Sequence, residues 1–132
     1  MTAPADKLKN RRELADECAA WRRRGETVAL VNGAFDMLHV GHLRYLEGAH
    51  ALGDHLVVAV NSDLSVRLGK GPKRPILPED ERVEMLSHLW MVDRICLFDD
   101  QTVAPVLERL RPAVHAKGTD YTVETVPERD VV

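Results

Sequence analysis

The sequence predicts an α/β protein with a doubly wound parallel sheet, because strand-like and helix-like segments alternate along most of the chain. Short apolar runs are typical of strands buried inside such a sheet, and they occur at residues 28–31, 55–60, 92–98 and 113–116. Between these runs, apolar side chains recur at helical intervals in residues 41–52, 78–90 and 102–110.

A further helix is predicted ahead of the sheet, over residues 6–24. Leu14, Cys18 and Trp21 would share one face of it, and Gly25 would end it. We therefore divide the chain into an N-terminal helix, residues 1–25, and a Rossmann-like domain, residues 26–132. No GxGxxG segment follows the first strand, which argues against a nicotinamide or flavin dinucleotide site.

Composition limits the partners and the compartment. The 132 residues carry a formal net charge of −3, which gives no general attraction for nucleic acid or for an anionic membrane. Cys18 and Cys96 lie in apolar patterns, so we expect buried thiols and neither zinc ligands nor a disulfide framework. The sequence shows no secretory signal and no apolar run of membrane-spanning length, and we expect a cytoplasmic protein.

The most informative stretch is VALVNGAFDMLHVGH, residues 28–42. A β-branched strand ends at Asn32-Gly33, and a helix begins close to Gly41, so His39 and His42 lie at the start of that helix. The first backbone N–H groups of a helix have no partner within it, and the helix dipole attracts anions there. The pattern predicts a polyphosphate site, in which Gly33 and Gly41 let a ligand approach the main chain.

Two later segments supply further candidates. Asn61 and Asp63 follow the second strand, where ligands of open α/β sheets bind, although Ser62 or Asp63 could equally cap a helix. Residues 64–77 are expected to form a flexible basic loop, which would bring Lys70, Lys73 and Arg74 onto a triphosphate or would merely be a solvated linker. Arg82, in the helix that begins after Pro78, is open to two interpretations: a phosphate or ribose contact, or a partner in a surface ion pair.

The NGAFD segment followed by His39-Val40-Gly41-His42 resembles the signature of the HxGH nucleotidyltransferase superfamily, in its cytidylyltransferase-like branch. Further resemblance lies in VAVNSD at residues 58–63, KGPKRP at 70–75 and KGTDY at 117–121. These segments are similar to those of bacterial D-glycero-β-D-manno-heptose 1-phosphate adenylyltransferases. The resemblance implies transfer of AMP from ATP, with Mg²⁺, to a sugar 1-phosphate, and a homodimer or higher homo-oligomer.

The resemblance also implies roles for individual residues. His39, His42 and Lys70 would be catalytic and would bind the phosphates. No residue is expected to hold a metal ion of its own, because His39 and His42 lack an obvious third ligand. The resemblance assigns nucleotide contacts to Asn32, Gly33, Ala34, Phe35, Gly41, Lys117 and Asp120, and substrate contacts to Asp36, Asn61, Asp63 and Arg74.

Two alternatives remain open. A cytidylyltransferase acting on glycerol 3-phosphate or a similar phosphate would perform the same chemistry with another base and acceptor. Members of this branch carry a C-terminal motif resembling S-T-T, which residues 26–132 are expected to lack, so a truncated, non-catalytic nucleotide-binding protein is the second alternative. The remaining histidines are expected to be structural: His50, His55, His88 and His115.

Overall fold

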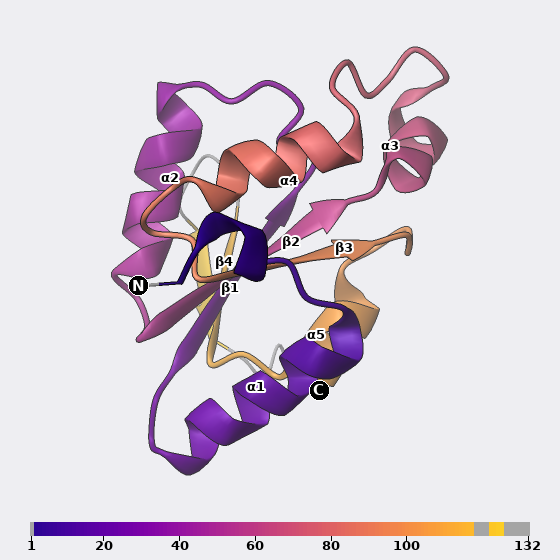
Figure 1. The fold of residues 1–132 in the computed structure, drawn as a ribbon. Helices are drawn as coiled ribbons and strands as arrows, with labels where there is room; N and C mark the ends of the chain where they lie inside the picture. The colour runs from indigo at the N-terminus through magenta and orange to yellow at the C-terminus, as the bar shows by residue number, and fades with distance from the viewer. Residues whose placement is uncertain (1, 118–121, 126–132) are drawn as a thin grey trace.

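The computed structural model describes residues 2–117 and 122–125. They form a sheet with the strand order β3-β2-β1-β4-β5 (Figure 1). Its strands are β1 Val28–Gly33, β2 His55–Asn61, β3 Arg94–Phe98, β4 Val114–Lys117 and β5 Thr122–Thr125. The first four strands are mutually parallel, which confirms the predicted α/β architecture, and β5 joins the edge of β4 in the antiparallel direction.

Strand β1 lies in the middle of the sheet, with β2 on one side and β4 on the other. Its apolar residues 28–31 are completely covered or nearly so, as a strand buried on both faces requires. The register pairs Asn32 with Ala59 and Gly33 with Val60, so β1 and β2 end almost level. The parallel order therefore brings the chain that follows β1 and the chain that follows β2 to one edge of the sheet.

Helices α2, Val40–His50, and α4, Glu79–Ser87, cover one face of the sheet (Figure 1). They bury Tyr45, Leu46 and Leu86 against the side chains that β1 and β2 direct to this face. The helical spacing over residues 78–90 predicts that Trp90 packs with the buried side of this helix, but the residue is 61% exposed, so that prediction is wrong. The helix ends at Ser87, so Trp90 lies in the following turn, where its ring meets the edge of His50.

Helices α1, Arg11–Arg23, and α5, Ala104–Leu110, cover the opposite face. The predicted residues Leu14, Cys18 and Trp21 of α1 are indeed buried, and both cysteines are free and buried. The predicted start at residue 6 is wrong. Asn10 caps α1 through a capping box with Glu13, and Leu8 before it forms a bridge to Ile95, which places residues 8–10 outside the helix. Pro4–Asp6 form a separate 3₁₀ turn, η1.

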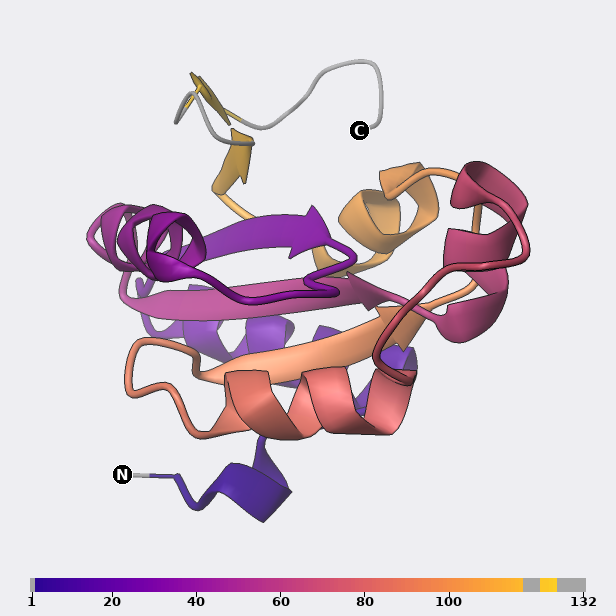
Figure 2. The same ribbon diagram turned by 90° about the horizontal axis from the view of Figure 1, so that it is seen from above.

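The segment predicted as a loop over residues 64–77 is helical in its first half. Helix α3, Asp63–Lys70, lies beyond the carboxyl end of β2 (Figures 1 and 2). The Ser62 side chain caps it by accepting a hydrogen bond from Ser65 N, so the capping interpretation of this serine is confirmed. No helix in the described ranges is long and apolar enough to cross a membrane.

Candidate nucleotide site

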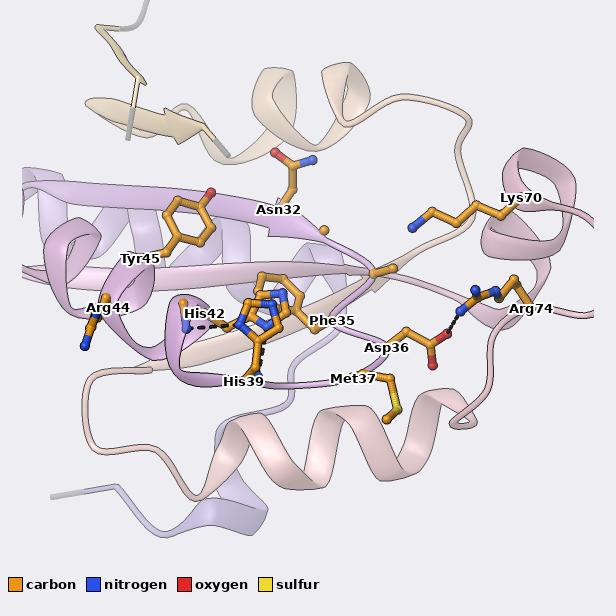
Figure 3. A pocket seen from close by; sticks show the side chains of 13 residues that line it. Asn32, Phe35, Asp36, Met37, His39, His42, Arg44, Tyr45, Lys70 and Arg74 are labelled. Atoms are coloured by element: carbon orange, nitrogen blue, oxygen red, sulfur yellow. Dashed lines mark hydrogen bonds and ion pairs between the residues drawn. The ribbon is translucent and has the colours of Figure 1, made fainter. Parts of the chain in front are cut away.

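A cavity of about 490 Å³ lies at the carboxyl edge of the sheet, between the end of β1, the start of α2 and the end of α3 (Figure 3). Ten of the predicted site residues line it: Asn32, Gly33, Ala34, Phe35, Asp36, His39, Gly41, His42, Lys70 and Arg74. Three residues that the sequence analysis did not assign to a site also line it: Met37, Arg44 and Tyr45. Tyr45 packs in the core face of α2, and its hydroxyl donates to the Ala116 carbonyl at 2.8 Å.

The turn after β1 contains a left-handed residue. Phe35 has a φ of 50°, a conformation that side chains other than glycine adopt rarely, and its ring is 5% exposed. A Cβ added at Gly33 would come within 3.2 Å of the Phe35 ring. Gly33 therefore makes room for Phe35, which lies beside the His42 ring with 5.6 Å between the ring centroids.

The two histidines form a capping box at the start of α2. Gly41 N donates to His39 Nδ1 at 3.0 Å, and His39 N donates to His42 Nδ1 at 3.2 Å. The ring centroids are 4.1 Å apart. Burial of the ring, and then the neighbouring His39, lower the pKa of His42 below its ordinary value.

Glycine is needed at position 41 for a structural reason that the sequence does not reveal. A Cβ at this position would lie 2.7 Å from His39 Cε1 and 3.0 Å from His39 Nδ1. Real Cβ atoms do not approach other atoms so closely. The glycine therefore permits the His39 ring to fold back over the first turn of α2, in addition to any room it leaves for a ligand.

Asp36 connects the turn after β1 to the segment that follows α3. Its carboxylate accepts hydrogen bonds from Ile76 N and Leu77 N at 2.8 to 2.9 Å and lies 3.7 Å from Arg74. Burial raises the pKa of this carboxyl, but the two backbone N–H groups, Arg82 and Arg74 outweigh it, and the net shift is downward. Asp36 thus holds the chain that carries Arg74 against the cavity that Lys70 also lines.

Arg82 is buried, so the surface position expected for an ion-pair partner is wrong, although the residue does form an ion pair, with Asp63. It donates to the carbonyls of Leu77, Ala34 and Asn61 and pairs with Asp63 at 2.7 Å. One buried cation therefore ties together the turn after β1, the end of β2, the start of α3 and the segment before α4.

The other predicted site residues lie outside the cavity lining or cannot be placed. Asn61 and Asp63 do not line it, and Arg82 bonds both of them. Lys117 is described only as a backbone position in β4, and Asp120 lies outside the described residues. Any contact of these four residues with a ligand remains a prediction.

His115 contributes indirectly to the cavity. It is 3% exposed on β4, and its Nε2 lies 2.7 Å from the side-chain oxygen of Asn32. Because an amide oxygen can only accept, His115 Nε2 is the donor in this pair. Asn32 is thereby left with its amide N–H groups as the donors that it can offer to a ligand.

The described residues contain no group of three or more His, Cys, Asp or Glu side chains arranged to hold a metal ion. The side chains that line the cavity suit Mg²⁺ that arrives with a nucleotide, because Mg²⁺ is usually held by substrate phosphates, water and one or two carboxylates. Asp36 is the only carboxylate that lines the cavity within the described ranges.

Comparison with known families places this architecture among the nucleotidyltransferases. Residues 30–131 match the cytidylyltransferase-like family model, so the chain belongs to that family. Among curated proteins it is similar to the bifunctional protein HldE of Trichlorobacter lovleyi, with 46% identity over 126 residues, and to that of Koribacter versatilis, with 48% over 120 residues. These alignments cover 96% and 91% of this chain but only 26% and 25% of the relatives, so the chain spans about a quarter of their length.

A solved structure shares the fold. The lipopolysaccharide core biosynthesis protein of Thermoplasma volcanium GSS1 is 34% identical, with a TM-score of 0.62. The match covers 69% of this chain and 73% of that protein. The sequence resemblance to the cytidylyltransferase-like branch is thus confirmed.

Proposed function

We propose that this protein transfers AMP from ATP to D-glycero-β-D-manno-heptose 1-phosphate, giving ADP-heptose and pyrophosphate. The observation that carries the proposal is the single cavity in which His39 and His42 at a helix start lie together with Lys70 and Arg74. Membership in the cytidylyltransferase-like family supports nucleotidyl transfer. The name of one relative, a lipopolysaccharide core biosynthesis protein, and the sequence resemblance to heptose 1-phosphate adenylyltransferases support a heptose acceptor.

The chemistry of AMP transfer suits the side chains that line the cavity. An oxygen of the acceptor phosphate attacks the α-phosphorus of ATP, a new P–O bond forms there, and the bond to the β-phosphate oxygen breaks as pyrophosphate leaves. The nucleophile is already an anion, so no strong base is required. Catalysis then depends on holding two anions in line and on stabilising the negative charge around phosphorus.

The roles of the residues follow from their positions. His39 and His42 would donate hydrogen bonds to phosphate oxygens next to the N-terminus of α2, where the helix dipole adds to the attraction. Lys70 and Arg74 would neutralise charge from the opposite wall of the cavity. Mg²⁺ would enter as part of the ATP substrate and screen its phosphates.

The test is Mg²⁺-dependent pyrophosphate release with heptose 1-phosphate, with ATP and CTP supplied in parallel. We expect release with ATP, and a loss of several orders of magnitude in His42→Ala while the protein stays folded. His88→Ala is the matched control, because His88 is exposed on the turn after α4 and does not line the cavity.

Each other outcome points to a different conclusion. Release with CTP alone would identify a cytidylyltransferase. Nucleotide binding without release would identify a non-catalytic nucleotide-binding protein. A folded His42→Ala variant with near-normal turnover would refute the role given to His42.

A further inference from the structure

We propose that His39 and His42 serve the ligand as neutral imidazoles, both fixed by the start of α2 in the tautomer that carries its proton on Nε2. The inference deepens the proposed function and rests on it only for the identity of the ligand. It concerns the protonation state in which two binding groups are held before any ligand arrives.

The hydrogen bonds of the capping box determine the tautomer. The partner of His39 Nδ1 is Gly41 N, and the partner of His42 Nδ1 is His39 N. A backbone N–H group can only donate, so each Nδ1 must present its lone pair. The proton of each neutral ring therefore lies on Nε2, and a second proton on Nδ1 would face an N–H group and break the box.

Nε2 is then the nitrogen left for a ligand. Both rings line the cavity, and within residues 2–117 and 122–125 no hydrogen bond to either Nε2 is formed. Each histidine can thus offer one N–H donor to an anionic oxygen, while its other nitrogen stays bound to the helix.

The surroundings favour uncharged rings. The two ring centroids are 4.1 Å apart, so two imidazolium ions would repel each other at close range. The other charged groups lining the cavity are Arg44, Lys70, Arg74 and Asp36, of which three are cations. The lowered pKa of His42, caused first by burial and then by His39, agrees with a neutral ring at neutral pH.

The same chain contains a capping box built from an amide and a carboxylate, which suggests a matched set of variants. Asn10 and Glu13 cap α1 with the spacing that His39 and His42 have on α2. Asparagine at the first position and glutamine at the second are preferred capping residues. His39→Asn and His42→Gln therefore keep an acceptor for each backbone N–H group and replace the ring, whereas His39→Ala removes the cap itself.

The first readout is the nitrogen NMR spectrum of the full chain with labelled histidine, recorded without ligand, with the two signals assigned from the single variants. We expect a pyridine-type shift for Nδ1 and a pyrrole-type shift for Nε2 in both residues at neutral pH. Protonation of Nδ1 in either residue would overturn the proposal. This measurement does not depend on adenylyl transfer, so its outcome is separable from failure of the proposed function.

The second readout pairs thermal unfolding with binding of inorganic pyrophosphate. His39→Asn should keep the melting temperature of the wild type and bind pyrophosphate roughly tenfold more weakly, which corresponds to one lost hydrogen bond. His39→Ala should lose both the binding and several degrees of melting temperature. A His39→Ala variant that melts with the wild type, or a His39→Asn variant that binds normally, would overturn the proposal.

Discussion

Gly41 determines the position of the His39 ring, because the space that a Cβ would occupy is filled by that ring. The residue lies in the first turn of α2, where alanine would ordinarily favour the helix by up to about 1 kcal/mol over glycine. Helix propensity and ring placement therefore predict opposite effects of the same substitution.

For Gly41→Ala, we expect turnover to fall on the order of 100-fold while the protein remains folded, since a displacement of about 1 Å at a catalytic group has that effect. Steady-state kinetics and circular dichroism measure the two effects separately. Gly69→Ala is the control, because Gly69 lies in α3 and a Cβ there would meet nothing within 4 Å. A Gly41→Ala variant as active as Gly69→Ala would contradict the role assigned to the glycine.

At the scale of elements, the segment between α3 and α4 depends on Asp36. Its carboxylate accepts the N–H groups of Ile76 and Leu77, and Asp36→Ala removes these acceptors. We expect the KM for ATP to rise about tenfold, the effect of one or two lost hydrogen bonds, because the chain that carries Arg74 is no longer fixed at the cavity.

Trypsin should also cleave Asp36→Ala faster after Lys70 and Lys73, which lie in or next to this segment. Asp16→Ala is the matched control, since Asp16 is an exposed carboxylate on α1. Unchanged KM and unchanged cleavage in Asp36→Ala would show that other contacts hold the segment.

Arg82 joins more elements than any single side chain described above. Arg82→Lys keeps the charge, but one ammonium group cannot reproduce a planar fork that bonds three carbonyls and Asp63. We expect a loss of about 3 kcal/mol in the free energy of unfolding, measured with urea, because buried acceptors lose their partner. Arg67→Lys on exposed α3 should change this free energy by less than about 0.5 kcal/mol.

The elements also show what the sequence predicted and what it did not. Buried strands and the His39–His42 turn were predictable, because their apolar runs and glycines have local causes. Helix α3 was not predictable, because its apolar residues Leu64, Val66 and Leu68 are spaced by two, which is not a helical interval. Of these three residues only Val66 is buried. The buried contacts of Arg82 include a partner 48 residues away in the sequence, which no local pattern reveals.

At the scale of the molecule, the N-terminal helix shares a hydrophobic core with the sheet. Cys18 on α1 and Cys96 on β3 belong to the same buried cluster. Burial raises the pKa of the Cys18 thiol to about 11 and that of Cys96 to about 12, so neither forms a thiolate at neutral pH.

We therefore expect both thiols to resist alkylation in the folded protein and to react together when the chain unfolds in urea. Mass spectrometry after a pulse of iodoacetamide measures the modification of each cysteine. Modification of both thiols at urea concentrations where the far-UV circular dichroism of the sheet is still native would instead show that α1 detaches as a separate unit.

The pH dependence of stability follows from His42. Burial and His39 lower its pKa in the folded state, whereas the unfolded chain keeps an ordinary value of about 6.5. Between these two values the unfolded state binds more protons, so stability rises with pH there. The contribution of His42 to the free energy of unfolding is complete above about pH 6.5. It is lost as the pH falls from there toward the pKa of His42 in the folded state.

Urea unfolding of the wild type and of His42→Gln at about pH 7.5 and about pH 5.5 tests this relation. Glutamine keeps an acceptor for His39 N but does not titrate, and the histidines that do not contact His42 are common to both proteins, so their effects cancel in the difference. We expect the wild type to lose stability relative to His42→Gln at the lower pH. Parallel pH profiles would mean that His42 binds its proton equally well in the folded and unfolded chain, which would contradict a ring held neutral by the capping box.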